Sequence, residues 1–343
     1  MAYRHETAGY KSRPWRLSIA IATLGLLYGL AGAPPALAED PGGTYNLLIE
    51  NDVFTGTDQH YTNGLRLSYL SGDNAVPDFI RQFAKAMPFV RPDAVLRAGY
   101  AIGHNIYTPN DITSAAPVAN ERPYAGYLYA GFAVVAESNN ILDTWEFDLG
   151  IVGPSAQGET VQNEFHKLIG VAGAQGWANQ LGDEPTLSLT HERKWRHLWP
   201  RPRSGLTLDV TPHLGVGLGN VSSYLNGGVT VRVGEGLARD FGPPRIRPSL
   251  PGSGFFKEAD SMGWYLYAGV DGRAVANNLF LDGNTFRDSL SVDKKTWVGD
   301  LQVGLVLTFP KARVAYTHVF RGKEFEGQAK GDHYGAISLS ARF

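Results

Sequence analysis

The densest group of oxygen-bearing side chains in this sequence follows the first strand-like segment. Asn51 and Asp52 end that segment, Asp58 follows in the loop, and the run Tyr61-Thr62-Asn63-Gly64 opens the next segment. Because the loop is short, it brings carboxylate, amide and hydroxyl oxygens to one rim, and Ca²⁺ takes such ligands. The spacing is not that of an EF-hand loop, and Asn and Asp are also ordinary turn formers. The cluster therefore predicts either a calcium site or a polar turn.

A histidine offers a second kind of chemistry. His166 lies four residues after Gln162 in an amphipathic stretch, residues 160 to 180, so both project from neighbouring parts of one helix face. Histidine is the usual general base near neutral pH, although an isolated surface histidine is more often inert. No G-x-S-x-G motif occurs, and Ser155, the nearest serine, has no supporting pattern. Water activated by His166, with a metal holding the developing oxyanion, fits these residues better than a serine nucleophile.

The third cluster is the run Asn120-Glu121-Arg122-Pro123-Tyr124-Ala125-Gly126. The planar guanidinium of Arg122 is suited to a phosphate, such as one on a lipid headgroup. The alternative is a rim arginine paired with Glu121 or with surface lipopolysaccharide. We take Arg122, Glu121 and Tyr124 as candidate substrate-binding residues.

The composition and the N-terminal segment limit the class of protein. The chain has 343 residues, a formal charge of −2 and no cysteine, which excludes disulfides, thiolate chemistry and a broadly basic nucleic-acid binder. Residues 1–38 combine a basic start, the apolar stretch Leu17 to Ala33 and the small-residue site Ala36-Leu37-Ala38. This pattern predicts a signal peptide cut after Ala38, with a transmembrane anchor as the alternative. Residues 39–343 then form the mature domain.

Alternation of apolar and polar residues indicates that this domain is all-β. It is clear from Thr144 to Ile151 and again from Ile337 to the terminal Phe343. The apolar face could line a soluble sandwich, but strands that end on an aromatic residue favour a lipid-facing outer-membrane barrel. Twelve antiparallel strands are predicted, an even number as such barrels require: Thr44 to Glu50, Tyr61 to Leu70, Arg97 to Ile106, Tyr124 to Ala136, Leu142 to Val152, Pro185 to Trp195, Leu206 to Leu218, Tyr224 to Val233, Met262 to Ala276, Thr296 to Phe309, Arg313 to Phe320 and His333 to Phe343.

Strand parity assigns the connections to the two sides of the membrane. With both termini periplasmic, the three polar clusters all lie on the extracellular side. The amphipathic stretch Pro77 to Met87, with Phe79, Ile80 and Phe83 on one side, is predicted as a periplasmic helix that plugs or covers the inner rim. The second stretch predicted as helical, Thr160 to Gln180, is extracellular, and its apolar stripe is Val161, Phe165, Leu168 and Ile169. The Gly- and Pro-rich stretch Gly234 to Gly254 is predicted only as a loop.

Several motifs in order resemble the lipid A 3'-O-deacylase (LpxR) family of outer-membrane enzymes. They run from Thr44 to the C-terminus and are densest up to about Trp177: Asn51-Asp52 with Phe54, Thr57-Asp58, Tyr61-Thr62-Asn63-Gly64, Ile106-Tyr107-Thr108-Pro109, Arg122-Pro123-Tyr124-Ala125-Gly126, Gly153-Pro154, and Gln162-Asn163 through His166 to Gly170. The resemblance implies a twelve-stranded barrel and Ca²⁺-dependent hydrolysis of the ester-linked acyl chains at the 3' position of lipid A.

The resemblance also implies residue roles. His166 would be the general base with Gln162 assisting beside it, and Asn51, Asp52 and Thr62 would build the calcium and water site. One position departs from the family pattern: Ala172 stands six residues after the histidine, where the family has a glutamate. The residue that orients His166 is therefore open.

Two other functions compete with this one. A non-enzymatic barrel, either a small channel or a structural protein, predicts a conducting lumen and no role for His166. An outer-membrane phospholipase keeps the hydrolase and changes the substrate. The partners that we expect are lipopolysaccharide, the outer membrane and the barrel assembly machinery, with no nucleic acid, and we expect a monomer.

Overall fold

The computed structural model describes residues 42–52, 60–199, 205–247, 252–258 and 260–343. The chain divides into two units, residues 1–39 and 40–343, and the second unit holds every described residue. The predicted signal peptide lies outside the described residues, as does Asp58 of the polar cluster.

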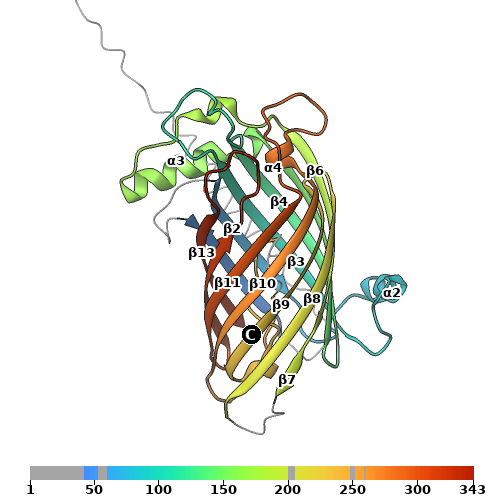
Figure 1. Cartoon of the computed structure of the whole chain (residues 1–343). Helices are drawn as coiled ribbons and strands as arrows, with labels where there is room; N and C mark the ends of the chain where they lie inside the picture. Colours follow the sequence, from blue (N-terminus) through green and yellow to red (C-terminus); the bar gives the residue numbers. More distant parts are fainter. Residues whose placement is uncertain (1–41, 53–59, 200–204, 248–251, 259) are drawn as a thin grey trace, which may run out of the picture. The chain divides into compact units, whose positions relative to one another are not determined.

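The second unit is a closed antiparallel β-barrel (Figure 1). The described residues contain thirteen strand segments: β1 (Thr44–Asn51), β2 (His60–Leu70), β3 (Val95–Thr108), β4 (Ala125–Ser138), β5 (Ile141–Val152), β6 (Glu184–Trp195), β7 (His197–Trp199), β8 (Thr207–Gly219), β9 (Ser222–Glu235), β10 (Gly263–Asn278), β11 (Trp297–Thr308), β12 (Ala312–Arg321) and β13 (Asp332–Arg342).

Twelve of these segments correspond to the twelve predicted strands. The extra segment, β7, follows β6 after a single residue, and both pair with β8, so the two form one side of the wall. β1 pairs with β2 on one edge and with β13 on the other, which closes the barrel. The prediction of a twelve-stranded antiparallel barrel is confirmed.

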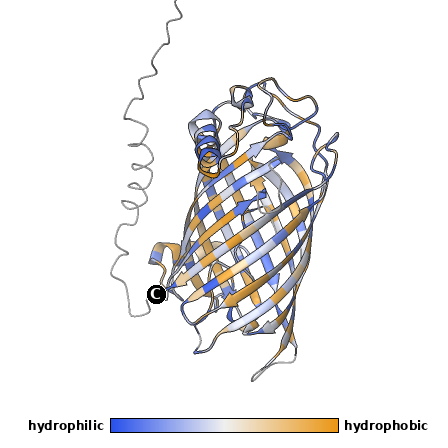
Figure 2. Ribbon diagram, turned by 90° about the vertical axis from the view of Figure 1, so that its left-hand side faces the viewer, coloured by the Kyte–Doolittle hydropathy of each residue, from blue (hydrophilic) through white to orange (hydrophobic). Residues whose placement is uncertain are grey.

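Side chains alternate between the lumen and the outer wall, as the two-residue period of a strand requires. On β11, Leu301, Val303 and Leu305 are exposed, whereas Asp300 and Gln302 are buried. Figure 2 shows hydrophobic residues spread over the outside of the wall. The lumen holds charged residues in ion pairs, such as Arg273 with Asp300. An apolar exterior around a polar interior is the pattern of a barrel in lipid.

Helices lie at both ends of the barrel. α3 (Gly158–Ile169) and α4 (Leu279–Asp282) lie at one end, which we call the α3 end, whereas α2 (Asp78–Ala86) lies outside the wall toward the other (Figure 1). Thr44 pairs with Arg342 at that other end, the termini end. Short 3-10 helices occur at Pro154–Ala156, Gly176–Asn179 and Leu237–Arg239. Among the described residues, no helix has the length and apolar character needed to cross a membrane.

Between β9 and β10, the described residues 236–247, 252–258 and 260–262 form an inner segment that folds back into the barrel instead of forming a simple loop. Asp240 is buried between Arg232 of β9 and Arg313 of β12, at 2.6 and 2.8 Å. Farther along, Arg247 reaches Glu192 of β6 at 2.7 Å. The sequence predicted only a Gly- and Pro-rich loop here, because its contacts are long-range ion pairs that local composition does not show.

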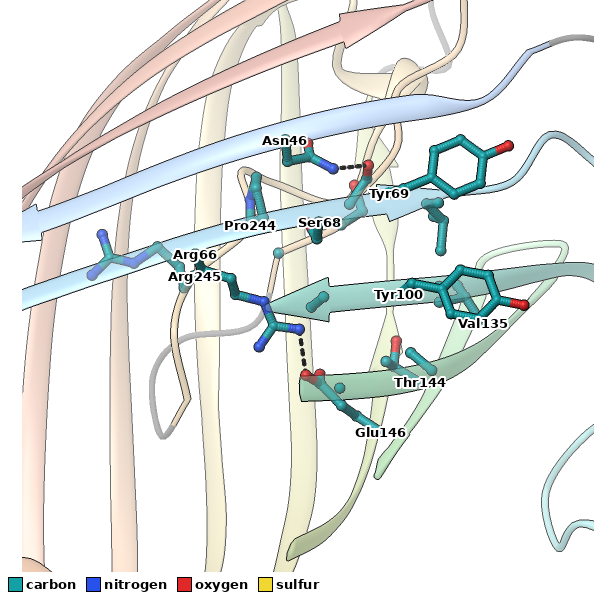
Figure 3. Close-up of a pocket in the computed structure, with 18 of the residues that line it drawn as sticks. Asn46, Arg66, Ser68, Tyr69, Tyr100, Val135, Thr144, Glu146, Pro244 and Arg245 are labelled. Atoms are coloured by element: carbon teal, nitrogen blue, oxygen red, sulfur yellow. Dashed lines mark hydrogen bonds and ion pairs between the residues drawn. The ribbon is translucent and has the colours of Figure 1, made fainter. Parts of the chain in front are cut away.

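This inner segment is held by polar contacts and also by buried apolar side chains, such as Phe241 and Phe255, which pack in one cluster with Leu70 of β2. Lys194 of β6 donates to the carbonyl of Gly252, and Arg313 donates to the carbonyl of Ser253. Beside it lies a cavity of about 90 Å³, lined by the segment and by β1 to β5 (Figure 3). The described part of the lumen is therefore divided into cavities by a folded segment.

Candidate functional site

The calcium candidates lie at the α3 end of β1 and β2. Asn51 is the last residue of β1 and pairs in register with Asn63 of β2. Thr62 is the extra residue of a β-bulge between Tyr61 and Asn63, and bulges re-aim a side chain. Its hydroxyl lies 2.9 Å from the hydroxyl of Thr108 on β3.

Asn51 is on the outer face of the wall, although it is buried. Glu50 points into the lumen, where Oε1 lies 2.9 Å from Arg245 of the inner segment. Asn51 follows it and therefore faces the opposite side. Asn51, Asp52 and Thr62 are all nearly inaccessible to solvent. The strand register thus places Asn51 beside the bulge that carries Thr62, and Asp52 follows Asn51 directly in the chain.

α3 ends at a glycine that returns the chain toward the helix. Gly170 has a left-handed φ of 74° and its N–H donates to the carbonyls of His166 and Lys167, which is a common helix C-cap. The N–H of Val171 also donates to the carbonyl of His166, at 2.9 Å. The chain after the helix therefore runs back past the ring of His166.

The helix shows the reverse of the usual burial. Gln162 and His166 are 2% and 3% exposed, whereas Leu168 is 82% exposed and Val161, Phe165 and Ile169 are also exposed. The expectation of a surface histidine was wrong, because α3 packs its polar side on the ends of β3 and β4. Gly126 allows this close approach: a Cβ there would lie 2.8 Å from the backbone nitrogen of Gly158.

The ring of His166 is oriented by a backbone group. Its Nδ1 lies 2.8 Å from the carbonyl oxygen of Ala172. Since a carbonyl only accepts, Nδ1 carries the proton, and Nε2 is the basic nitrogen of the neutral ring. The residue at position 172 thus still supplies an acceptor to the histidine, but through its main chain, where the family resemblance implied a carboxylate.

The turn that carries this carbonyl is itself fixed by Asn163. Its side-chain oxygen accepts from the N–H of Ala174 at 2.9 Å. Only a weak signal pointed to this residue in advance, since Gln162-Asn163 is one of the motifs of the resemblance. The role itself depends on a turn geometry that the sequence alone does not reveal.

Gln162 is held by an aromatic pair. Its Oε1 accepts from the indole nitrogen of Trp177 at 2.9 Å, and Trp177 packs on Tyr124 with ring centroids 4.9 Å apart. The Nε2 of Gln162 is buried and has no hydrogen-bond partner among the described residues. Gln162 therefore keeps a donor available beside His166.

The arginine of the third cluster is inside the barrel. Arg122 is 2% exposed, lies over the ring of Tyr107 and reaches Glu324 at 3.5 Å. The suggested pairing with Glu121 was wrong, because Glu121 contacts His60 instead. Burial raises the pKa of Glu324, but Arg321 and Arg122 outweigh it and hold that pKa below its usual value. Arg122 also lines a second cavity of about 70 Å³.

Sequence reasoning missed a histidine that joins three loops at this end. His60 is buried, with Nδ1 2.6 Å from Asp332 and Nε2 2.9 Å from Glu121. Gln328 donates to the other oxygen of Asp332 at 3.1 Å. A carboxylate at each ring nitrogen requires both nitrogens to donate. In the sequence, the signal that could have indicated His60 was its place two residues before Thr62.

The donor chemistry at β1 and β2 suits calcium. Asn51, Asp52 and Thr62 offer amide, carboxylate and hydroxyl oxygens, which hard cations prefer. Zinc, by contrast, is usually bound through histidine nitrogen or cysteine sulfur, and neither atom type belongs to this donor set. The residues present therefore fit Ca²⁺ better than zinc.

Comparison with known proteins places the chain in a family. The family described as outer membrane protein LpxR matches residues 19–343. The chain belongs to the LpxR family. The resemblance drawn from its motifs is thereby confirmed, as is its character as an outer-membrane barrel.

One of the solved structures similar to this chain supports the fold. LpxR from Salmonella typhimurium has 20% sequence identity and a TM-score of 0.73, covering 88% of this chain and 100% of that one. The beta domain of the Bordetella autotransporter BrkA has 10% identity and a TM-score of 0.44, covering 89% and 99%. No curated protein sequence matches the chain significantly.

Proposed function

We propose that this LpxR-family protein is a hydrolase that removes ester-linked acyl chains from the 3' position of lipid A, with its site on the extracellular side. The observation that carries the proposal is the reversed burial of α3. Its polar side, with Gln162 and His166, faces the barrel wall, and its apolar side, including Leu168, is exposed beside the lipid-facing strands. A polar site reached across an apolar rim suits an ester within a lipid.

The chemistry assigned to His166 is general-base catalysis. With Nδ1 donating to the Ala172 carbonyl, Nε2 takes a proton from water as the water oxygen attacks the ester carbonyl. The same carbonyl of Ala172 stabilises the imidazolium that results. The proton then passes to the leaving alkoxide, so the products are a fatty acid and a free hydroxyl.

The oxygen cluster would hold the cation. Asn51, Asp52 and Thr62 are its proposed ligands, and Thr108 positions the Thr62 hydroxyl. Calcium bound there would stabilise negative charge on the ester oxygen. The Nε2 of Gln162 offers a further donor beside His166.

Two of the candidate substrate-binding residues, Tyr124 and Glu121, act by supporting other residues of the site. Tyr124 supports Trp177, which holds Gln162. Glu121 fixes His60, which lies two residues before the proposed calcium ligand Thr62. Arg122 stays in the proposal as a phosphate-binding candidate, although its burial and its pairing with Glu324 favour a role in positioning the loop.

The folded inner segment argues against the channel alternative. A small channel needs a continuous aqueous path, whereas the described residues of the inner segment lie in the lumen and form ion pairs with β1, β6, β9 and β12. We also propose that the protein works as a monomer, since the closed barrel leaves no strand edge to pair.

A test uses the purified protein in detergent with two substrates, lipid A and phosphatidylethanolamine. Fatty acid should be released from lipid A with Ca²⁺, and a chelator or Asp52→Ala should abolish release while the barrel still shows its heat-dependent gel shift. Release from phosphatidylethanolamine alone would establish the phospholipase instead. Undiminished release in excess chelator would remove calcium from the proposal.

A further inference from the structure

α2 has three distinct sides. Ile80 and Ala84, one turn apart, are buried, whereas Phe79 and Phe83 are 71% and 57% exposed. The cationic Lys85 is on the remaining side, away from both pairs at 100° per residue. The sequence predicted the helix but placed Phe79, Phe83 and Ile80 together on one packed face, and the structure separates them.

The buried side lies on the outside of the barrel, not on its inner rim. Ile80 and Ala84 pack with four apolar wall residues at the termini end of two neighbouring strands: Leu96 and Ala98 of β3, and Val134 and Ala136 of β4. Figure 1 shows α2 outside the wall. The expected plug over the rim is therefore not formed by this helix.

The wall under α2 continues the lipid-facing belt. Next to Ala98 and Val134 along the same strands come Tyr100 and Phe132, which face outward with ring centroids 5.7 Å apart. Tyr100 is exposed. α2 thus covers the last apolar positions of a surface that contacts the bilayer above it.

The segment after the helix adds a third exposed aromatic residue to this region. Phe89 is exposed, packs on His191 of β6 and is held there by Arg193, which donates to its carbonyl at 2.7 Å. Basic residues accompany the aromatic ones, since Arg81, Lys85 and Arg91 outnumber Asp78 and Asp93 in residues 78–93. Exposed aromatic residues beside cations are the signature of a helix lying in a membrane interface.

We propose that α2 and the segment up to Phe89 form an interfacial anchor that binds the phospholipid of the periplasmic leaflet, with Phe79, Phe83 and Phe89 in the acyl region and the cations on the polar side, toward the phosphates and water. The wall holds one side of the helix, lipid covers the aromatic side, and water meets the side with Lys85. This inference rests on the outer-membrane barrel and is independent of the hydrolase.

The absence of cysteine allows a direct test, because any cysteine introduced is the only one. Phe83→Cys and the matched control Lys85→Cys, both exposed positions of one helix, are labelled with a nitroxide. Each protein is reconstituted in vesicles of phosphatidylethanolamine and phosphatidylglycerol. Collision rates with oxygen, which enriches in lipid, and with a water-soluble nickel chelate give the depth of each label.

The label at position 83 should lie about 5–10 Å below the phosphate plane, the usual depth of an interfacial helix, and the label at position 85 should lie in water. Equal exposure of both labels to the nickel chelate would overturn the proposal. Phe79→Cys provides a second reading, and the heat-dependent gel shift confirms that each variant is folded. A label at 83 shielded from both quenchers in native membranes, but not in vesicles, would assign the face to a protein partner and overturn the lipid assignment.

Discussion

His166 and Gln162 are enclosed on a helix whose other large side chains face outward. Their burial makes them sensitive to substitution in two ways, through chemistry and through packing. His166→Gln is the better probe of the base because it keeps a polar side chain of similar reach. Lys167→Gln, at an exposed neighbouring position, is the matched control.

The base hypothesis predicts a specific product. His166→Gln should lose activity by a factor of about 10² to 10⁴, the usual contribution of a general base, and Lys167→Gln should not. Reaction of the wild-type protein in heavy-oxygen water should label the released fatty acid, with no acyl-enzyme detected by mass spectrometry. A trapped acyl-serine, or full turnover by folded His166→Gln, would contradict the mechanism.

The carbonyl of Ala172 leads to a prediction about which side chains orient the base. Ala172→Ser should be neutral, because the side chain is exposed and the carbonyl remains. Asn163→Ala should lower kcat by up to about 10²-fold with little change in KM, since it frees the turn that carries the carbonyl. Steady-state kinetics of the two variants test this prediction. A strong loss in Ala172→Ser with none in Asn163→Ala would show that the turn is not what orients His166.

For single residues, the sequence predicts the residue types at the site but not their surroundings. The oxygen donors Asn51, Asp52 and Thr62 could be predicted because they sit at the ends of adjacent strands. The orientation of His166 could not, because a main-chain acceptor leaves no trace in residue type. His60 was missed for a related reason: its partners Glu121 and Asp332 are 61 and 272 residues away.

Among the elements, the inner segment connects the lumen to the site. Arg245 and the N–H of Ile246 both contact Oε1 of Glu50, at 2.9 and 3.3 Å. Glu50 directly precedes Asn51 and Asp52, and Ile246 packs with Leu48 of the same strand. The inner segment therefore supports the tip of β1 from the side opposite the proposed calcium ligands.

Removing that support should weaken both folding and activity. Arg245→Met leaves Glu50 as a buried charge without its cation, and breaking such a pair typically costs about 3–5 kcal/mol. The temperature of thermal unfolding in detergent should fall, and the calcium concentration for half-maximal activity should rise. The double variant Arg245→Met, Glu50→Gln removes both charges and should regain most of the stability. If Arg245→Met has wild-type stability and calcium dependence, the inner segment does not support the site.

Elements with local periodicity were predictable, and elements defined by distant contacts were not. The twelve strands and both longer helices follow from periods of two and of 3.6 residues. The faces of α2 and α3 were assigned on the assumption that apolar residues pack inward, which a membrane environment reverses. The described residues of the inner segment show no period, since distant contacts hold them, including ion pairs to six strands.

The whole molecule is a closed barrel with a partly filled lumen. Its assembly should depend on the last strand, where Phe343 stacks on Tyr45 of β1 at 5.2 Å between ring centroids. In detergent the folded protein should migrate faster on gels before heating than after, and Phe343→Ala should reduce the yield of the fast form. A soluble product without this shift would contradict the barrel.

The filled lumen predicts low conductance. Purified protein in planar bilayers should show no stable channels, because the inner segment obstructs the aqueous path. A variant in which residues 240–256 are replaced by a short Gly-Ser linker should conduct. Steady channels in the wild-type protein would favour the channel alternative.

The central claim is that the protein deacylates lipid A at the 3' position. The most direct measurement is mass spectrometry of lipid A from Gram-negative cells that produce either the wild-type protein or His166→Gln at equal levels in the outer membrane. The account predicts that only the wild-type cells contain lipid A lacking the 3'-linked acyl group. Unchanged lipid A in cells with correctly folded wild-type protein, or the same loss in both strains, would contradict it.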